Sequence, residues 1–317
     1  MAATKTHGIY NIGIGIAAPT MIGGVTDLRA ATDPQFRAET AGGEIYPRGV
    51  AFTGQIPQGS FITYHVAKAL AAIGLTGYDV NSAATPATSL YLYLQKFATG
   101  STREGVTAHI QYQGHRGIIV PRTLTVGYDA DAAITYDFYL IKAGGNDPIV
   151  KTGSVTLPVA AADDERFTLG PMQIGGNVLT GLRRWTLDFN VAVRTEKADN
   201  DTWPTNVWIS SIAPSLELIG IDPDWMYDAA NDIIKLSGNA AAHADTIFYL
   251  RKWDEDNVSV VADGTAEHVK FTMAGIAAIS QPFAVSGSDP AETGIKMQSH
   301  YDGTNAPVVV NTASAIT

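Results

Sequence analysis

The chain has 317 residues, of which 45% are hydrophobic, and its 21 Lys and Arg against 31 Asp and Glu give a formal net charge of −10. That length predicts about two domains with substantial cores, and the acidic balance disfavours specific nucleic-acid binding because phosphate backbones attract basic surfaces. Cysteine is absent, which excludes disulfides, zinc–cysteine sites, iron–sulfur clusters and thiol nucleophiles.

The N-terminal segment is predicted to form a strand. It lacks the roughly 7–15-residue apolar core of a signal peptide, and no run of about 18 apolar residues occurs in the chain, so we expect a soluble protein that is made in the cytoplasm and does not enter a membrane. GIGIAA at 13–18 resembles a dinucleotide fingerprint, but Ile12, Ile14 and Ile16 alternate and Pro19 follows. Alternation of this kind favours a strand over a strand-turn-helix.

Two kinds of helical signal interrupt the strands. In 65–74, Val66, Leu70 and Ile73 fall on one helical face, and Gly74 is placed to end the helix. A shorter helix is predicted at 222–232 in the second half, where an Asp-Pro pair suits the N-cap and first helical position. Each half is therefore expected to carry one short helix.

The remaining segments predict antiparallel β-structure. Residues 122–141 and 183–197 have apolar residues at every second position, with many β-branched and aromatic types. Turns with Thr, Gly or Pro recur about every ten residues, which is typical of a sandwich or a barrel. The predicted fold is mainly β, with two similar β-sandwich or barrel domains in tandem.

The two halves of the sequence repeat each other in the same order. Four pairs of segments align at separations of 156 to 159 residues, and short insertions in surface loops account for this drift. A tandem duplication is therefore predicted, with copy 1 at 1–160 and copy 2 at 161–317, joined through the small, acidic segment 159–167. The matched positions are Pro47 and Pro204, Pro57 and Pro214, Lys96 and Lys252, His109 and His268, and Pro148 and Pro307.

Residue types that carry chemistry occur without a catalytic or metal-binding spacing. The acidic clusters at 129–131, 199–201 and 254–256 lack the calcium-loop pattern, the seven histidines form no HxH or HExxH pair, and no P-loop or GxSxG motif is present. His109 and His268 occupy equivalent places, which favours a hydrogen-bonded structural role over catalysis. We expect no enzyme activity, cofactor or metal, although a Ser–His–Asp triad assembled by the fold stays open.

Three kinds of segment recur in the two halves: Ile22-Gly23-Gly24 and Ile174-Gly175-Gly176, YPRGV and WPTNV after a polar excursion, and the closing strands at DPIV and APVVV. Together with the short helix they resemble the tail tube proteins, or major tail proteins, of long-tailed bacteriophages. The resemblance spans essentially the whole chain as two copies, and it implies a β-sandwich that closes into a barrel with its ring neighbours, an outer helix and a long β-hairpin arm reaching the next ring. Such tubes are usually built from single-domain hexamers, so the duplication implies a trimer with pseudo-sixfold symmetry.

The resemblance places one arm at 31–48 and the other at 194–205. Both segments are polar, mixed in charge and bounded by strands, as a salt-sensitive contact between rings would be, although an exposed hairpin without a role is an equally good interpretation. The candidate ring-to-ring residues are Arg37, Glu39, Glu44, Arg48, Arg194, Glu196, Lys197 and Asp201.

The function implied is that of a structural virion protein of the phage tail. It would self-assemble into stacked rings, contact other tail proteins and let DNA pass non-specifically through an acidic lumen that repels phosphates, while its sheet edges pair with neighbours. One alternative is a trimeric double-barrel capsid protein, which needs about eight strands per half and has little use for an arm. The other is a carbohydrate-active β-protein, which should have an exposed aromatic platform or paired carboxylates in a cleft.

Overall fold

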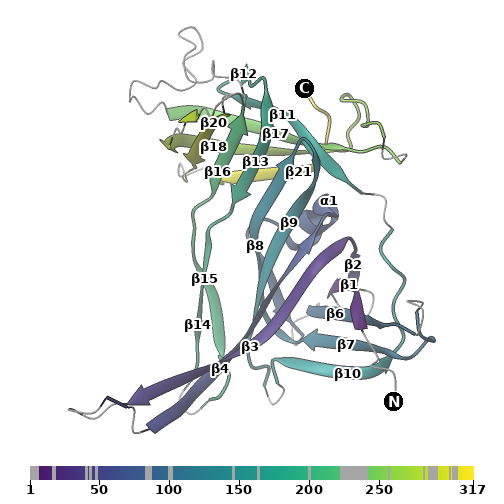
Figure 1. Ribbon diagram of the computed structural model, residues 1–317, viewed down its shortest axis with the longest axis vertical. Helices are drawn as coiled ribbons and strands as arrows, with labels where there is room; N and C mark the ends of the chain where they lie inside the picture. The colour runs from purple at the N-terminus through teal and green to yellow at the C-terminus, as the bar shows by residue number, and fades with distance from the viewer. Residues whose placement is uncertain are drawn as a thin grey trace.

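The structure, a computed structural model, consists almost entirely of antiparallel β-strands (Figure 1), which confirms the predicted mainly β class. It describes residues 7–15, 19–39, 42, 45–46, 49–82, 88–98, 103–144, 147–162, 165–198, 201–221, 242–255, 258–280, 283–284, 292–299, 301 and 306–317.

The strands of the first half have the following bounds: β1 (His7–Gly15), β2 (Thr20–Ile22), β3 (Val25–Glu39), β4 (Gly49–Thr63), β5 (Tyr78–Asn81), β6 (Ser89–Lys96), β7 (His109–Gly114), β8 (Arg116–Gly127), β9 (Ala130–Leu140) and β10 (Ile149–Val155). Those of the second half are β11 (Phe167–Ile174), β12 (Asn177–Val178), β13 (Leu182–Asp188), β14 (Val191–Glu196), β15 (Asn206–Ile212), β16 (Ser215–Gly220), β17 (Ala242–Lys252), β18 (His268–Ser280), β19 (Phe283–Ala284), β20 (Glu292–Gln298) and β21 (Val308–Ser314).

These strands form two sheets and a ribbon. A 14-stranded sheet runs in the order β12-β11-β17-β18-β20-β16-β13-β8-β9-β4-β3, with β19, β21 and β5 attached to β20, β18 and β8. A five-stranded sheet runs β10-β7-β6-β1-β2, and β14 pairs with β15 alone. Side chains from both sheets, including Ile12 and Leu92 of the small sheet and Phe61 and Tyr136 of the large one, pack into one hydrophobic core.

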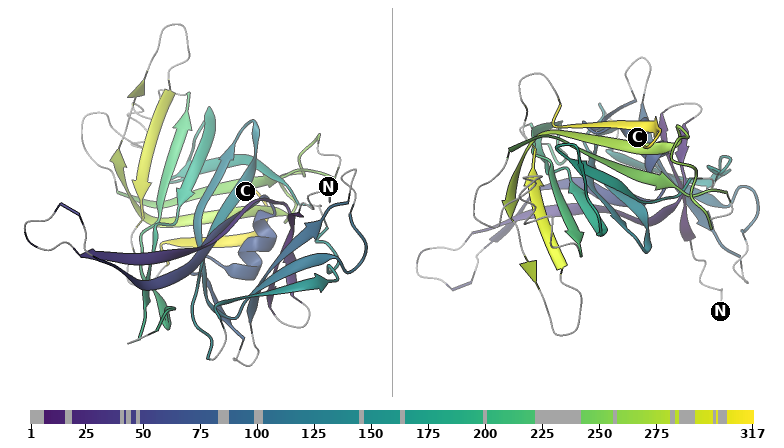
Figure 2. Two further views of the ribbon diagram at one scale, coloured as in Figure 1. Left: turned by 60° about the horizontal axis from the view of Figure 1, so that its bottom comes forward. Right: turned by 90° about the horizontal axis from the view of Figure 1, so that it is seen from above.

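The large sheet passes without interruption from the first half into the second. Strand β8 pairs with β13 from Thr123 opposite Asp188 to Gly127 opposite Arg184. We call this pairing the internal joint; Figure 2 shows the two groups of strands side by side. The two predicted domains therefore share a sheet, although the sequence suggests two separate units.

The order of strand pairing in the first half recurs in the second. The pairs β1–β2, β1–β6, β6–β7 and β7–β10 correspond to β11–β12, β11–β17, β17–β18 and β18–β21. The series β3-β4-β9-β8 corresponds to β13-β16-β20 followed by β18 and β19. The strand register is also equivalent in the two halves. Ser60 lies opposite Asp137 in the first half, and the residues 157 and 159 positions further on, Glu217 and Lys296, lie opposite each other in the second.

The helix predicted in the first half is confirmed as α1 (Val66–Ile73). Val66, Leu70 and Ile73 are buried as expected, and the N–H of Gly74, at a φ of 79°, donates to the Leu70 carbonyl at 2.8 Å. The helix predicted at 222–232 lies outside the described residues.

Described residues of the connecting segment at 159–167 contact the first half. Its Glu165 is buried, and the carboxylate accepts the backbone N–H of Lys68 in the first turn of α1 at 3.0 and 3.3 Å. The acid thus satisfies a free donor at the positive end of the helix. Just before this segment, Tyr10 of β1 donates its hydroxyl to the Pro158 carbonyl at 2.9 Å.

The two IGG segments occupy different places, and their equivalence was wrong. Ile22 ends β2 and precedes β3, whereas Gly175 and Gly176, with φ of 58° and 84°, form the turn between β11 and β12. The second-half counterpart of Gly24 is Gly181, because each carbonyl accepts the equivalent backbone N–H, from Tyr64 at 3.2 Å and from Ile221 at 3.0 Å. The two IGG segments look alike because turns at different places in the fold both need glycine at a positive φ.

Candidate assembly interfaces

Each half contains one buried histidine that bonds the same pair of strands. The Nδ1 atoms of His109 and His268 accept the backbone N–H of Lys96 and Lys252, both at 3.1 Å, and neither side chain is exposed. The ammonium of Lys96 pairs with Glu104 at 2.8 Å, as that of Lys252 pairs with Glu267 at 2.6 Å. The geometry is that of a structural hydrogen bond between strands β6 and β7, or β17 and β18.

His109 should make stability depend on pH. Burial first, and then the nearby Arg103 guanidinium, lower the pKa of His109 below its ordinary value near 6.5. The unfolded chain therefore binds the proton more readily, so the free energy of unfolding is fully present above about pH 6.5 and falls as pH decreases below it. His109→Gln should flatten this decrease, measured by urea unfolding at several pH values between 7.5 and 5. His115→Gln serves as the control, and an unchanged slope in His109→Gln would contradict the assignment.

The predicted arms lie in two hairpins of different length. The first hairpin, β3 and β4, stays paired from Val25 opposite Thr63 out to Glu39 opposite Gly49, and it projects from the body in Figure 1. The second, β14 and β15, is shorter and runs beside the first half. Arg37, Arg194, Glu196 and Lys197 are exposed on these hairpins, Glu39 is placed by its backbone, and Glu44, Pro47 and Arg48 lie outside the described residues.

The end of the second hairpin is bound to the first half of the same chain. Gln55 donates its backbone N–H to the Thr202 carbonyl at 2.9 Å, and Lys142 donates its N–H to the carbonyl of the buried Pro204 at 2.8 Å. The Lys142 ammonium pairs with the Asp201 carboxylate at 2.7 Å. We call this set the arm contact. Asp201 is thus engaged within the chain, whereas a ring-to-ring role for the other candidates stays a prediction.

Several strand edges have no partner among the described strands, and β3 and β19 are two of them. There β3 pairs with β4 alone, and β19 with β20 alone. Beside the β3 edge lies an apolar groove of about 500 Å³, between β3 and the small sheet. It is lined by Ile9, Leu28, Ala30, Ala31, Thr32, Leu92, Leu94, Tyr112 and Ile149. Such edges invite pairing with another strand.

The side of the large sheet that faces away from the core is polar. We call it the polar face; its described charged residues on β3, β8, β9, β13, β16 and β20 include Asp27, Arg29, Asp33, Arg122, Asp137, Arg184, Asp188, Glu217, Glu292 and Lys296. Six of these are acidic and four are basic, so charges of both signs are interspersed on this face with an acidic excess. Burial raises the pKa of Asp137, and Arg122, 3.8 Å away, opposes that effect.

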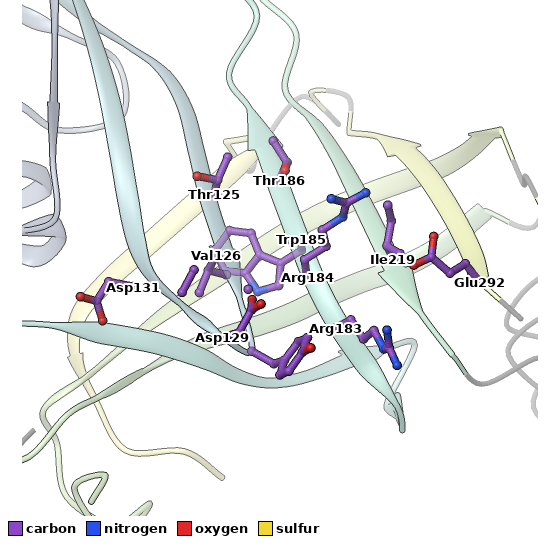
Figure 3. A pocket seen from close by; sticks show the side chains of 13 residues that line it. Thr125, Val126, Asp129, Asp131, Arg183, Arg184, Trp185, Thr186, Ile219 and Glu292 are labelled. Atoms are coloured by element: carbon purple, nitrogen blue, oxygen red, sulfur yellow. The ribbon is translucent and has the colours of Figure 1, made fainter. Parts of the chain in front are cut away.

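A hollow of about 460 Å³ lies where the polar face crosses the internal joint (Figure 3). Thr125 and Thr186 contribute from the paired strands, and Asp129, Arg184 and Glu292 lie around them. These charges are of mixed sign, and within the described part of the chain no group of three or more His, Asp and Glu is arranged to hold a metal ion. The hollow is therefore a polar seam between two strands.

Comparison with known proteins adds no assignment, because the sequence matches no family model and no curated protein. No helix in the described residues is long and apolar enough to cross a membrane.

Proposed function

We propose that this chain is a structural protein of a bacteriophage tail, that it assembles with itself into stacked rings forming the tail tube, and that its halves are tandem copies at 1–160 and 161–317. The observation that supports this most is the internal joint. It links two units of the same strand order into one continuous sheet, and the corresponding edges of β3 and β19 have no partner among the described strands. A heterologous interface that repeats with rotation builds a ring.

Three chains would supply six equivalent units to such a ring. The pseudo-sixfold trimer follows from two units per chain, and the projecting first hairpin gives each chain an arm that can reach a neighbour or other tail proteins. A role in the virion, after synthesis in the host cytoplasm, belongs to the same proposal.

The polar face is the proposed lining of the lumen. Acidic side chains outnumber the basic ones among which they lie, so phosphates would meet no continuous basic surface that would hold them. DNA passage then depends on the absence of strong attraction, and it needs neither catalysis nor a cofactor.

The proposal is tested by negative-stain electron microscopy and sedimentation velocity over a concentration series. We expect rings that stack into hollow tubes, with stacking weakened as salt increases because the arms carry charge. Arg37→Glu should shorten tubes and leave rings intact, whereas Arg116→Glu, an exposed charge outside the hairpins, should leave tube length unchanged. Closed shells would favour the capsid alternative, and monomers at every concentration would contradict self-assembly.

A further inference from the structure

We propose that β19 of one copy pairs with the free edge of β3 in a second copy, in the register of the internal joint, so that the second half of each chain joins the first half of the next. This inference rests on the proposed self-assembly and identifies the surfaces that carry it.

The register follows from equivalent strand pairs. In the pair β8–β9, Leu124 lies opposite Ile134. The equivalent of Ile134 in the second half is Thr293, which lies opposite Phe283 in the pair β19–β20. Phe283 therefore corresponds to Leu124, and Ala284 to Thr125. For the partner strand of the joint, Thr186 lies opposite Glu217 in β13–β16, and Arg29 lies opposite the equivalent residue, Ser60, in β3–β4. Arg29 thus corresponds to Thr186, and Ala30 to Leu187. Since Thr125 faces Thr186 and Leu124 faces Leu187 in the internal joint, the proposed pairs are Ala284 with Arg29 and Phe283 with Ala30.

The groove beside β3 is the open counterpart of a closed cluster. At the internal joint, Trp185 is 1% exposed and packs against Phe248 and Phe271, with ring centroids 4.9 and 6.0 Å away. The corresponding first-half residues, Leu28, Leu92 and Tyr112, all line the groove of about 500 Å³. Leucine is smaller than tryptophan, and no described strand covers the edge of β3, so this cluster stays open in the single chain.

Residue sizes at the two joints are complementary. The internal joint sets leucine against leucine, at Leu124 and Leu187, and both are fully buried. At the corresponding positions of the proposed joint the sequence has Phe283 and Ala30, one large residue and one small one. The two pairs are therefore similar in summed residue size, as close packing at equivalent joints requires.

The arm contact supports the same pairing independently. The counterparts of Gln55 and Lys142, which bind the second hairpin, are Ile212 and Tyr301 in the second half. Tyr301 is 63% exposed, and Ile45 and Tyr46, which correspond to Thr202 and Trp203, are 90% and 80% exposed on the first hairpin. Burying these apolar side chains against a second copy is favourable. The arm contact and the edge pairing thus connect the same two halves in the same direction.

Engineered disulfides test the register, since the natural chain has no cysteine. In Arg29→Cys/Ala284→Cys, mild oxidation of the assembled protein should join neighbouring chains, and non-reducing gels should resolve covalent dimers and trimers. Opposed residues in an antiparallel pair have Cα atoms about 4.5–5.5 Å apart, within the disulfide range. Ala31→Cys/Ala284→Cys is displaced along the strand to roughly 7–8 Å and should cross-link poorly. Thr125→Cys/Thr186→Cys is the positive control, and it should close a bridge within one chain.

The outcomes separate this inference from the proposed function. If rings form but the in-register pair gives no covalent multimers, or the displaced pair cross-links faster, the edge assignment is wrong and self-assembly stands. Monomers by sedimentation at every concentration would overturn both. Circular dichroism melts of each reduced variant establish that the substitutions leave the fold intact, so the absence of cross-links in a folded, assembled variant counts against the pairing.

Discussion

Replacing Trp185 with alanine is expected to lower the free energy of unfolding by about 3–5 kcal/mol. The indole is 1% exposed and packs edge-on against the stacked rings of Phe248 and Phe271 at the point where the two halves join. Removing it leaves a cavity and takes away its aromatic contacts with both rings. Urea unfolding measures the lost free energy of unfolding, with far-ultraviolet circular dichroism as the signal because tryptophan fluorescence changes with the substitution.

Leu28→Ala is the matched control, because Leu28 holds the corresponding position in the first half. Its side chain is only partly buried, against the open groove, so the isolated chain should lose about 1 kcal/mol. In the assembled protein the same substitution should cost more, since the proposed pairing covers the groove. Equal losses for Trp185→Ala and Leu28→Ala in the monomeric state would contradict the difference in packing between the two positions.

Local features of the fold were predictable from sequence. Alternation in 122–141 predicted the strands β8 and β9, and apolar spacing with Gly74 predicted α1. The buried histidines were found by their matching positions, since a residue that fills the same structural place in both halves recurs at a constant separation. These signals depend on neighbours in the chain or on one fixed shift, and both can be read from a single sequence.

The interfaces were not predictable, because they depend on pairing between distant strands. Periodicity identifies Thr123, Leu124 and Thr125 as a strand but does not say that β13 lies beside them. The contact of Asp201 with Lys142 likewise depends on where the second hairpin ends. The net charge gives the total only, so it could not show which face of the sheet carries which charges. Phe283 holds the position of Leu124, and Leu28 holds that of Trp185. These matches can be read from the sequence, but they become informative only once the internal joint is known.

The edge of β3, which no described strand covers, could pair with unintended partners along a long strand. Natural proteins protect such edges with charges, and Asp27 and Arg29, paired at 3.0 Å, lie on this one. Both belong to the polar face, however, so the opposite side at Leu28 and Ala30 keeps its apolar character beside the groove. An edge that is charged on one side and apolar on the other favours a partner strand with a matching apolar side over indiscriminate pairing.

Placing a charge at Ala30 is expected to prevent assembly without unfolding the chain. Ala30 is exposed in the single chain, so Ala30→Lys should change the free energy of unfolding by less than about 0.5 kcal/mol. In the proposed joint the same position corresponds to Leu187, which is 0% exposed, and an ammonium buried there without a partner carries a large desolvation penalty. The concentration at which rings form should increase at least about 100-fold, or about 2.7 kcal/mol, measured by sedimentation velocity.

Ala38→Lys is the matched control on the same strand. Ala38 is exposed on the projecting part of the first hairpin, opposite Val50, and beyond the proposed joint. It introduces the same charge into β3, so rings of this variant should form at the concentration required by the natural chain. If Ala30→Lys assembles as readily as Ala38→Lys, the apolar side of the β3 edge is not buried between chains. Ring formation would then have to use another surface, with the tail-tube proposal intact and the β3–β19 pairing excluded.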